Sequence, residues 1–367
     1  MEFTEAIRSI GHEGYLGAVF DHIRRENSLD IAFLGGSITQ GCHATAQEKR
    51  FSDLFTKGLS ERFPRARIGM FNAGIGATTS QFGCARVREH ILSRKPQLAV
   101  VDFSVNDSPQ ELFAETFESL IRVLLSDENI KAVIILNNTF FDGRKSAAEI
   151  HDEVAAHYGL PIVDCARVFI PLMEGGKFAP LELSTDYLHP TDIGHEMIAK
   201  MLLSLTEAAF ERFGKGYDGR GKPCLPERVT GCGYEECEML DRRRLKPALS
   251  GFEEDTSAGQ PFHDPFKNGW LGCKKGDRLE FSFTGKKLLI QWRKTPRRPA
   301  PTAVAYIEGE DSVRVTLDAE FEEDWGDLSC ITPIWESETV QRRTLVLEIV
   351  KSADDEAFMV MSFIVCR

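Results

Sequence analysis

The chain has 367 residues, 42% of them hydrophobic and 27% charged, and its formal net charge at pH 7 is -12. These values are typical of a globular protein with one or two domains. The acidic balance argues against a nucleic-acid partner, which requires a basic face. No apolar run approaches the length of a membrane span, so we expect no membrane partner either. The first residues show no basic-then-apolar leader, and we expect a cytoplasmic location.

Nine cysteines are scattered along the chain. Their odd number and wide spacing favour reduced thiols over a disulfide framework. Cys224, Cys232 and Cys237 lie close together, but they lack the Cys-x-x-Cys and histidine spacing of a zinc site. We therefore expect no metal.

Short apolar segments alternate with amphipathic ones through the first 213 residues. Helical spacing of apolar residues predicts helices at about 13–26, 48–62, 80–93, 109–126, 145–158 and 190–213. Short apolar runs predict strands at 31–34, 67–72, 98–103, 132–136 and 161–164. Such alternation predicts a parallel sheet with right-handed crossovers.

Polar residues follow these strands one after another. Ser37 comes after two glycines at the exit of the first strand, and Asn106 follows the third. The carboxyl ends of parallel strands share one edge of the sheet, which is where open α/β sheets bind ligands. Asp186 and His189 lie three residues apart on a loop before the last helix. A serine hydroxyl becomes a nucleophile when a base removes its proton, and a carboxylate orients that base. Together these residues therefore predict that Ser37 is a nucleophile.

Each of these signals has a plainer interpretation. Gly-Gly-Ser alone is more often only a turn, and the turn at residues 74–80 could be a capped helix start that holds no anion. We interpret Cys42 as a packing residue and His195 as a packing or surface residue. Asn137 and Asn138 end the fourth strand, and whether they line a substrate pocket stays open.

The composition changes at residue 214, where a glycine-, proline- and charge-rich stretch begins. Beyond it, short alternating segments predict strands at 278–284, 287–292, 302–307, 312–318, 344–350 and 358–365. We expect a domain at 1–215, an irregular connection at 216–250 and an all-β sandwich, similar to a jelly roll, at 251–367.

All four tryptophans lie in this last part. Singly, Trp270, Trp292, Trp325 and Trp335 are each best interpreted as core residues. Whether the four together form a surface that stacks on sugar rings stays open.

Four blocks in the first domain together resemble the SGNH (GDSL-like) hydrolases. They are residues 35–37 (Gly-Gly-Ser), 72–76 (Asn-Ala-Gly-Ile-Gly), 105–107 (Val-Asn-Asp) and 186–190 (Asp-Tyr-Leu-His-Pro). The resemblance covers about residues 28–205. It departs from the family where Gly36 replaces the usual aspartate, where Ser104 replaces a glycine, and where Ala77 follows Gly76 in place of a second glycine.

The resemblance implies a flavodoxin-like, three-layer α/β/α domain with a parallel five-stranded sheet in the order 2-1-3-4-5. It implies Ser37 as nucleophile, His189 as base and Asp186 as the residue that orients His189. The amides of Ser37 and Gly76 and the side chain of Asn106 would form the oxyanion hole, with Ala77 left as an alternative to Gly76. No cofactor is implied.

Relatives with an added β-sandwich often act on acylated carbohydrates. The resemblance therefore implies a serine esterase that removes a short acyl group, acetyl first, from a sugar. Two alternatives stay open: a glycan-binding protein on a hydrolase scaffold, and an acyltransferase that uses the same triad. The sequence leaves the oligomeric state open.

Overall fold

The computed structural model describes residues 3–214, 217, 219, 221–257, 263–310 and 314–367. It divides into two compact units, Met1–Glu235 and Glu236–Arg367, which are described separately.

The first unit is built on a six-stranded sheet in the order β1-β6-β5-β4-β2-β3. Its strands are β1 (Ile7–Ile10), β2 (Ser28–Gly35), β3 (Arg67–Gly74), β4 (Leu98–Asp102), β5 (Ala132–Asn137) and β6 (Pro161–Asp164). The five strands from β2 to β6 are parallel, and their order confirms the predicted 2-1-3-4-5 arrangement. The antiparallel edge strand β1 was not predicted, because four residues of mixed burial carry no clear period.

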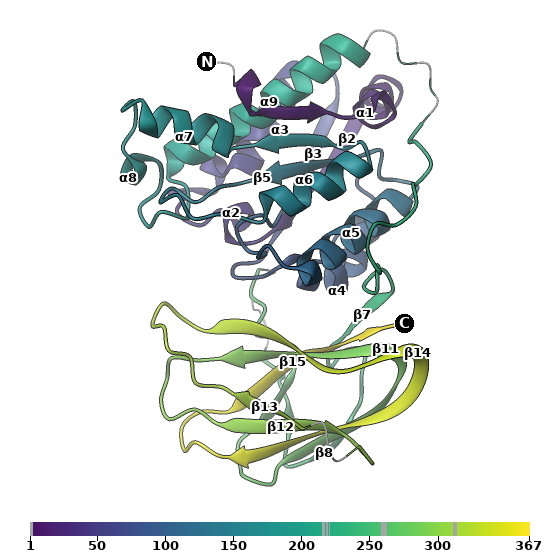
Figure 1. The fold of residues 1–367 in the computed structure, drawn as a ribbon, viewed down its shortest axis with the longest axis vertical. Coiled ribbons are helices and arrows are strands. Elements are labelled where there is room, and N and C mark those ends of the chain that lie inside the picture. The colour runs from purple at the N-terminus through teal and green to yellow at the C-terminus, as the bar shows by residue number, and fades with distance from the viewer. Residues whose placement is uncertain (1–2, 215–216, 218, 220, 258–262, 311–313) are drawn as a thin grey trace. The chain divides into compact units, whose positions relative to one another are not determined.

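Helices cover both faces of this sheet, as Figure 1 shows. They are α1 (Glu13–Glu26), α2 (Ser37–Gln40), α3 (Phe51–Arg62), α4 (Ser80–His90), α5 (Glu111–Ser126), α6 (Ala148–His157), α7 (Ala166–Glu174), α8 (Pro180–Leu183) and α9 (Asp192–Phe213). α1 and α3 pack against α9, whereas α4 packs against α5 and α5 against α6. Among the described helices, none is both long and apolar enough to cross a bilayer.

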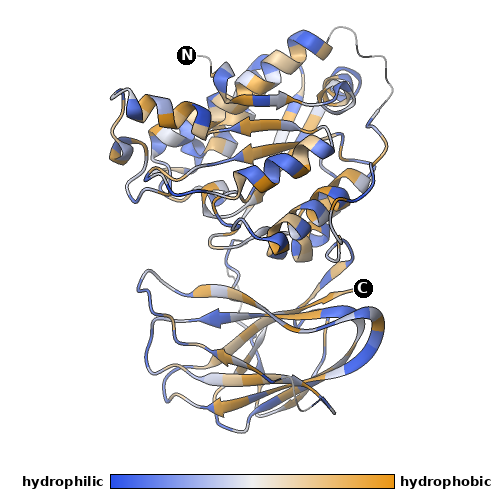
Figure 2. Ribbon diagram, viewed as in Figure 1, coloured by the Kyte–Doolittle hydropathy of each residue, from blue (hydrophilic) through white to orange (hydrophobic). Residues whose placement is uncertain are grey.

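The strands are apolar because they lie between these helical layers. Every residue of β4 and β5 is buried, and the orange strands of Figure 2 show the same hydrophobic layer. Burying one such aliphatic side chain stabilises the fold by about 1.5–3 kcal/mol. The chain runs outward from β2 first to β3 and later to β4, so the loops after β2 and β4 meet at a topological switch point.

The second unit is an antiparallel β structure, which confirms the predicted all-β class. Its strands are β7 (Cys237–Leu240), β8 (Ala248–Ser250), β9 (Glu253–Glu254), β10 (Trp270–Gly272), β11 (Arg278–Lys294), β12 (Thr302–Ile307), β13 (Arg314–Asp318), β14 (Leu328–Lys351) and β15 (Phe358–Cys366). β7 and β8 form inside 216–250, the segment expected to be irregular. The first two residues of the strand predicted at 312–318 lie outside the described residues.

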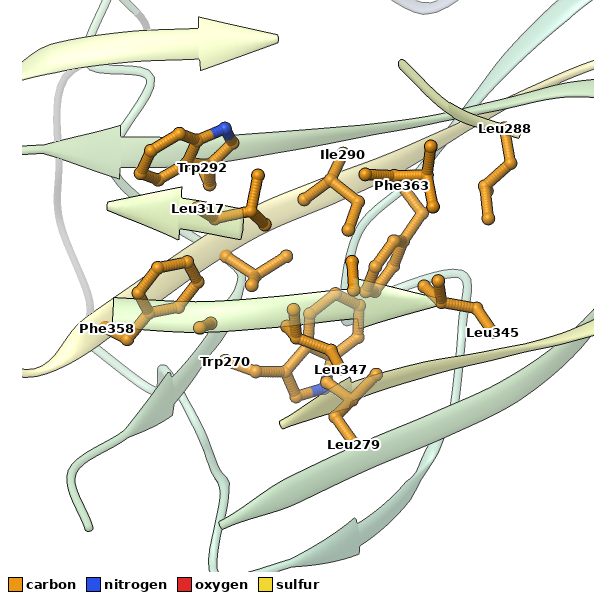
Figure 3. Packing of buried hydrophobic residues seen from close by; sticks show 14 of the residues in the cluster. Trp270, Leu279, Leu288, Ile290, Trp292, Leu317, Leu345, Leu347, Phe358 and Phe363 are labelled. Carbon is orange, nitrogen blue, oxygen red and sulfur yellow. The ribbon is translucent and has the colours of Figure 1, made fainter. Parts of the chain in front are cut away.

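The strands predicted at 278–284 and 287–292 are one continuous strand, β11, with a bulge between Gly285 and Lys287. The bulge changes which side chains join the core cluster: odd-numbered residues do so before it, and even-numbered ones after it. Both halves of β11 therefore face one core, where Leu279 and Ile290 pack together with Phe363 in the same cluster (Figure 3).

Three of the four tryptophans belong to this core. Trp270, Trp292 and Trp335 are buried, which agrees with the interpretation of each as a packing residue. Trp325 is 55% exposed and packs edge-on against Phe321. The described tryptophans thus do not form one shared surface.

The expectation of reduced thiols is wrong for two of the nine cysteines. Cys237 on β7 and Cys366 on β15 are directly opposite each other in the antiparallel pair and form a disulfide. Spacing along the chain could not reveal this pair, because 129 residues separate the two cysteines. Cys224 and Cys232 stay free.

We predict that the purified protein, kept without reductant, shows seven titratable thiols when denatured and nine after reduction. Cys237→Ser should lower the thermal unfolding midpoint, because a disulfide closing so long a loop contributes up to about 5 kcal/mol. The exposed Cys224→Ser variant is the matched control and should unfold like the parent. Nine thiols before reduction would refute the disulfide.

Candidate active site

Ser37 lies at the exit of β2, where the backbone is packed too closely for side chains. A Cβ atom on Gly35 would lie 2.2 Å from Thr39 Oγ1, and one on Gly36 would lie 2.2 Å from Asn106 Oδ1. Ser37 then begins the single-turn helix α2 and is 7% exposed. The first amides of a helix have no acceptor within it, so the Ser37 N–H faces no helical carbonyl.

His189 connects Ser37 to Asp186 through two hydrogen bonds. Ser37 Oγ donates to His189 Nε2 at 2.8 Å, and His189 Nδ1 donates to Asp186 Oδ2 at 2.6 Å. The serine comes from the loop after β2, whereas the other two residues come from the turn before α9. The structure therefore brings together the three predicted residues in the order that activates a serine hydroxyl.

The carboxylate of Asp186 is held by its own turn. Asp186 Oδ1 accepts hydrogen bonds from Ser184 Oγ at 3.1 Å and from the amides of Leu188 and His189 at 3.0 and 2.7 Å. Burial by itself would raise the pKa of Asp186, but the bonds from the His189 ring and the two amides outweigh it and hold this pKa well below its usual range. Asp186 therefore stays charged and can stabilise a protonated His189.

Asn106 lies on the loop after β4, beside the nucleophile. The amides of Asn106 and Asp107 both donate to Phe103 O at 2.9 Å, which forms a tight turn. This turn brings the Asn106 side chain against Gly36. Asp107 accepts from the Ser80 amide at 2.9 Å and so supports the start of α4.

A buried hydrogen bond fixes α2 to the end of β4. Thr39 Oγ1 donates to Asp102 Oδ2 at 2.8 Å, and both side chains are buried. Burial raises the pKa of Asp102 to about 6, although the hydrogen bond from Thr39 opposes that rise. The bond holds the backbone turn that carries Ser37.

The turn after β3 carries two backbone amides, those of Gly76 and Ala77, and the sequence could not decide which of them is the oxyanion donor. The Gly76 N–H, the predicted oxyanion donor, already donates to Gln40 Oε1 at 2.8 Å. Ala77 has a φ of 53°, in the left-handed region that favours glycine. Because Gln40 occupies the Gly76 N–H, the Ala77 amide is the remaining candidate donor on this turn.

Arg86 of α4 reaches into the space behind both loops and is fully buried. Its Nη1 donates to Ala73 O at 2.6 Å, and its Nη2 donates to Gly35 O at 3.1 Å. Burial lowers the pKa of Arg86 to about 9, so the guanidinium is still charged at neutral pH. The two bonds join the ends of β2 and β3. The sequence did not reveal this residue, because an arginine in a polar helix is expected at the surface.

The structure answers whether Asn137 and Asn138 line a substrate pocket. Asn137 is fully buried and donates to Asp152 Oδ1 at 2.7 Å. Asn138 is 2% exposed, and its carbonyl accepts from Ser104 Oγ at 2.9 Å. Neither side chain has surface to offer a substrate, since both fill the interior at the end of β5.

The other candidates have packing roles. Burial, followed by the charge of Asp186, raises the pKa of the Cys42 thiol, which opposes formation of a nucleophilic thiolate. His195 is fully buried, and its Nε2 donates to Cys42 O at 3.1 Å.

His43 is a neighbour of the triad that sequence reasoning missed. Its ring centroid lies 5.0 Å from that of His189, and its Nε2 lies 3.9 Å from Asp186 Oδ2. A histidine six residues after the nucleophile, on an irregular loop, carries no periodic or motif signal.

Known proteins resemble both the first unit and the whole chain. Residues 33–197 match the GDSL-like Lipase/Acylhydrolase family. Two solved structures of a two-domain esterase (CEX) active on acetylated mannans, one co-crystallised with mannopentaose, are 32% identical to this chain with a TM-score of 0.93. Each match covers 99% of this chain and 97% of that one. The chain belongs to the GDSL-like lipase/acylhydrolase family.

Family membership makes the protein a carboxylic-ester hydrolase. An acetylxylan esterase from Geobacillus stearothermophilus, Axe2, matches 48% of the chain at 20% identity with a TM-score of 0.42. No curated protein matches the sequence.

We predict that Gly36→Ala lowers kcat for a small acetate ester by about tenfold or more, because the new methyl group displaces Asn106 from the nucleophile. The matched control is Gly69→Ala on β3, whose Cβ would meet only the ends of the exposed, ion-paired side chains of Asp30 and Arg67. Equal kcat values for the two variants would contradict the close packing of Asn106 on Gly36.

Proposed function

We propose that the protein is a serine esterase that removes acetyl groups from a mannan-type carbohydrate through an acyl-enzyme on Ser37. The supporting observation is the continuous hydrogen-bonded chain from Ser37 through His189 to Asp186, with bonds of 2.8 and 2.6 Å. The choice of sugar is supported by the full-length relative, which is active on acetylated mannans.

In the first step, Ser37 Oγ attacks the ester carbonyl while His189 Nε2 takes the hydroxyl proton. The charged Asp186 stabilises the imidazolium that results. His189 then protonates the departing sugar hydroxyl, which leaves the acyl group on Ser37. No metal or organic cofactor is needed for these steps, and the absence of a cofactor stays a prediction.

The tetrahedral oxyanion needs preorganised donors in this step. The donors proposed here are the Ser37 amide, the Asn106 side chain and the amide of Ala77. Ala77 is preferred over the predicted Gly76 because the Gly76 N–H is bonded to Gln40 Oε1. Gln40 would thus hold the turn that presents the Ala77 amide.

Water, activated by His189, releases the acyl group in the second step. If another sugar hydroxyl took the place of water, the same residues would perform acyl transfer. Product analysis with an added acceptor alcohol separates these outcomes: free acetate supports hydrolysis, and an acylated acceptor supports transfer.

The cytoplasmic location also stays a prediction. The Cys237–Cys366 disulfide weighs against it, because disulfides persist mainly in oxidising compartments.

We predict that Ser37→Ala and His189→Ala each lower acetate release from acetylated manno-oligosaccharides by about a thousandfold or more. Ser60→Ala, whose hydroxyl bonds its own helix at Thr56 O, is the control and should retain activity. Near-normal release by either triad variant would exclude the mechanism. Activity on simple acetate esters but not on acetylated mannan would leave the triad intact and exclude the substrate.

A further prediction concerns the oxyanion turn. Gln40→Met keeps the side-chain volume but removes the acceptor for Gly76 N–H, so we expect kcat to fall about tenfold or more with little change in KM. Ala77→Gly keeps the amide and relieves the left-handed backbone, so its kcat should stay near that of the parent. Loss of activity in Ala77→Gly with none in Gln40→Met would contradict this assignment.

A further inference from the structure

Three side chains beside the nucleophile form a cluster of metal-ligand type. His43, Asp186 and His189 each offer one ligand atom, and these atoms all lie within 4.8 Å of one another. Two of them belong to the proposed triad, whereas His43 comes from the loop after α2. This cluster goes beyond the esterase reaction, in which His43 has no part.

A hydrogen bond with Thr185 holds one ring nitrogen of His43 while the other lies near the Asp186 carboxylate. His43 Nδ1 lies 2.8 Å from Thr185 Oγ1, while its Nε2 lies 3.9 Å from Asp186 Oδ2. Fixing one ring nitrogen in this way is how proteins direct the other nitrogen to a metal. His43 also has a φ of 65°, an unfavourable conformation for a residue with a side chain.

The loop that carries His43 is itself attached to α9. The amide and hydroxyl of Thr45 donate to the two carboxylate oxygens of Asp192 at 2.8 and 2.7 Å. On the other side of His43, the carbonyl of Cys42 accepts from His195. His43 is thus held between two anchored residues rather than placed on a free loop.

The donor set suits a transition metal. Two imidazoles and one carboxylate are ligands that bind Zn²⁺ well. Metal–ligand bonds of about 2.0–2.2 Å at tetrahedral angles place ligand atoms about 3.3–3.6 Å apart. The observed separations from Asp186 Oδ2, 2.6 Å to His189 Nδ1 and 3.9 Å to His43 Nε2, lie on either side of that range. Small side-chain rotations would therefore complete the site.

Solvent ions can reach the cluster. The side chains of His43 and Asp186 are 41% and 40% exposed, and that of His189 is 20% exposed. Zn²⁺ would then compete with the hydrogen bond between His189 and Asp186.

We propose that His43, Asp186 and His189 form a reversible inhibitory site for Zn²⁺. The inference rests on the proposed role of His189 as base. Coordination requires the lone pair of His189 Nδ1, so the one proton of the neutral ring moves through solvent from Nδ1 to Nε2. Nε2 then carries hydrogen and cannot accept the Ser37 proton. The metal acts as an inhibitor and takes no part in the esterase steps proposed above.

The first measurement is inhibition by ZnCl₂ of the full-length enzyme on a chromogenic acetate ester, each variant being compared with its own uninhibited rate. We expect Zn²⁺ to inhibit the parent, EDTA to restore it, and Mg²⁺ to have no effect. His43→Gln should raise the half-inhibiting Zn²⁺ concentration by about tenfold or more. His22→Gln on α1 is the matched control and should behave like the parent. Equal Zn²⁺ sensitivity of His43→Gln and the parent would overturn the proposal.

The second measurement does not need catalysis. Calorimetric titration of the Ser37→Ala protein with ZnCl₂ should show one site that the Ser37→Ala/His43→Gln protein lacks. An identical titration of both proteins would overturn the metal site, whether or not the esterase mechanism is correct. An enzyme that is active but insensitive to Zn²⁺ would overturn the inhibition alone and leave the proposed function intact.

Discussion

The close packing at the exit of β2 is the constraint on which the site depends. Gly35 lies against Thr39 and the end of β4, and Gly36 lies against Asn106, with no room for a Cβ atom on either. This contact lets the loops after β2 and β4 meet at the switch point of the sheet.

The buried Arg86 side chain holds the ends of β2 and β3 together, and its energetics indicate that it fixes geometry more than it adds stability. Removing a cation such as Arg86 from water costs several kcal/mol. Its two bonds to backbone carbonyls, as hydrogen bonds to a charged group, contribute about 1.5–3 kcal/mol each. These terms nearly cancel, so Arg86 adds little net stability. Its contribution is to fix the distance between the ends of β2 and β3, and with it the separation of Ser37 from the turn at Gly76 and Ala77.

The sequence predicted those features that leave a periodic pattern or an ordered set of motifs in the chain. The parallel strands followed from the apolar runs, and the grouping of Ser37 with Asp186 and His189 followed from their places after strands and before the last helix. The strand order followed from the family resemblance of four spaced blocks. What it missed depends on contacts between distant segments: the Cys237–Cys366 pair, the buried Arg86 and the loop that brings His43 beside Asp186. The interior positions of Asn137 and Asn138 were undecidable for the same reason, because a polar residue after a strand can face either a pocket or a buried partner such as Asp152.

The central claim is that Ser37, activated by His189, is the nucleophile of this esterase. Its most direct test is to treat the full-length protein with a phosphonate ester that traps activated serines, and to map the adduct by peptide mass spectrometry. The account predicts a single adduct on Ser37, formed in the parent and strongly slowed in His189→Ala. An adduct on another residue, or equal labelling of Ser37 in both proteins, would contradict it.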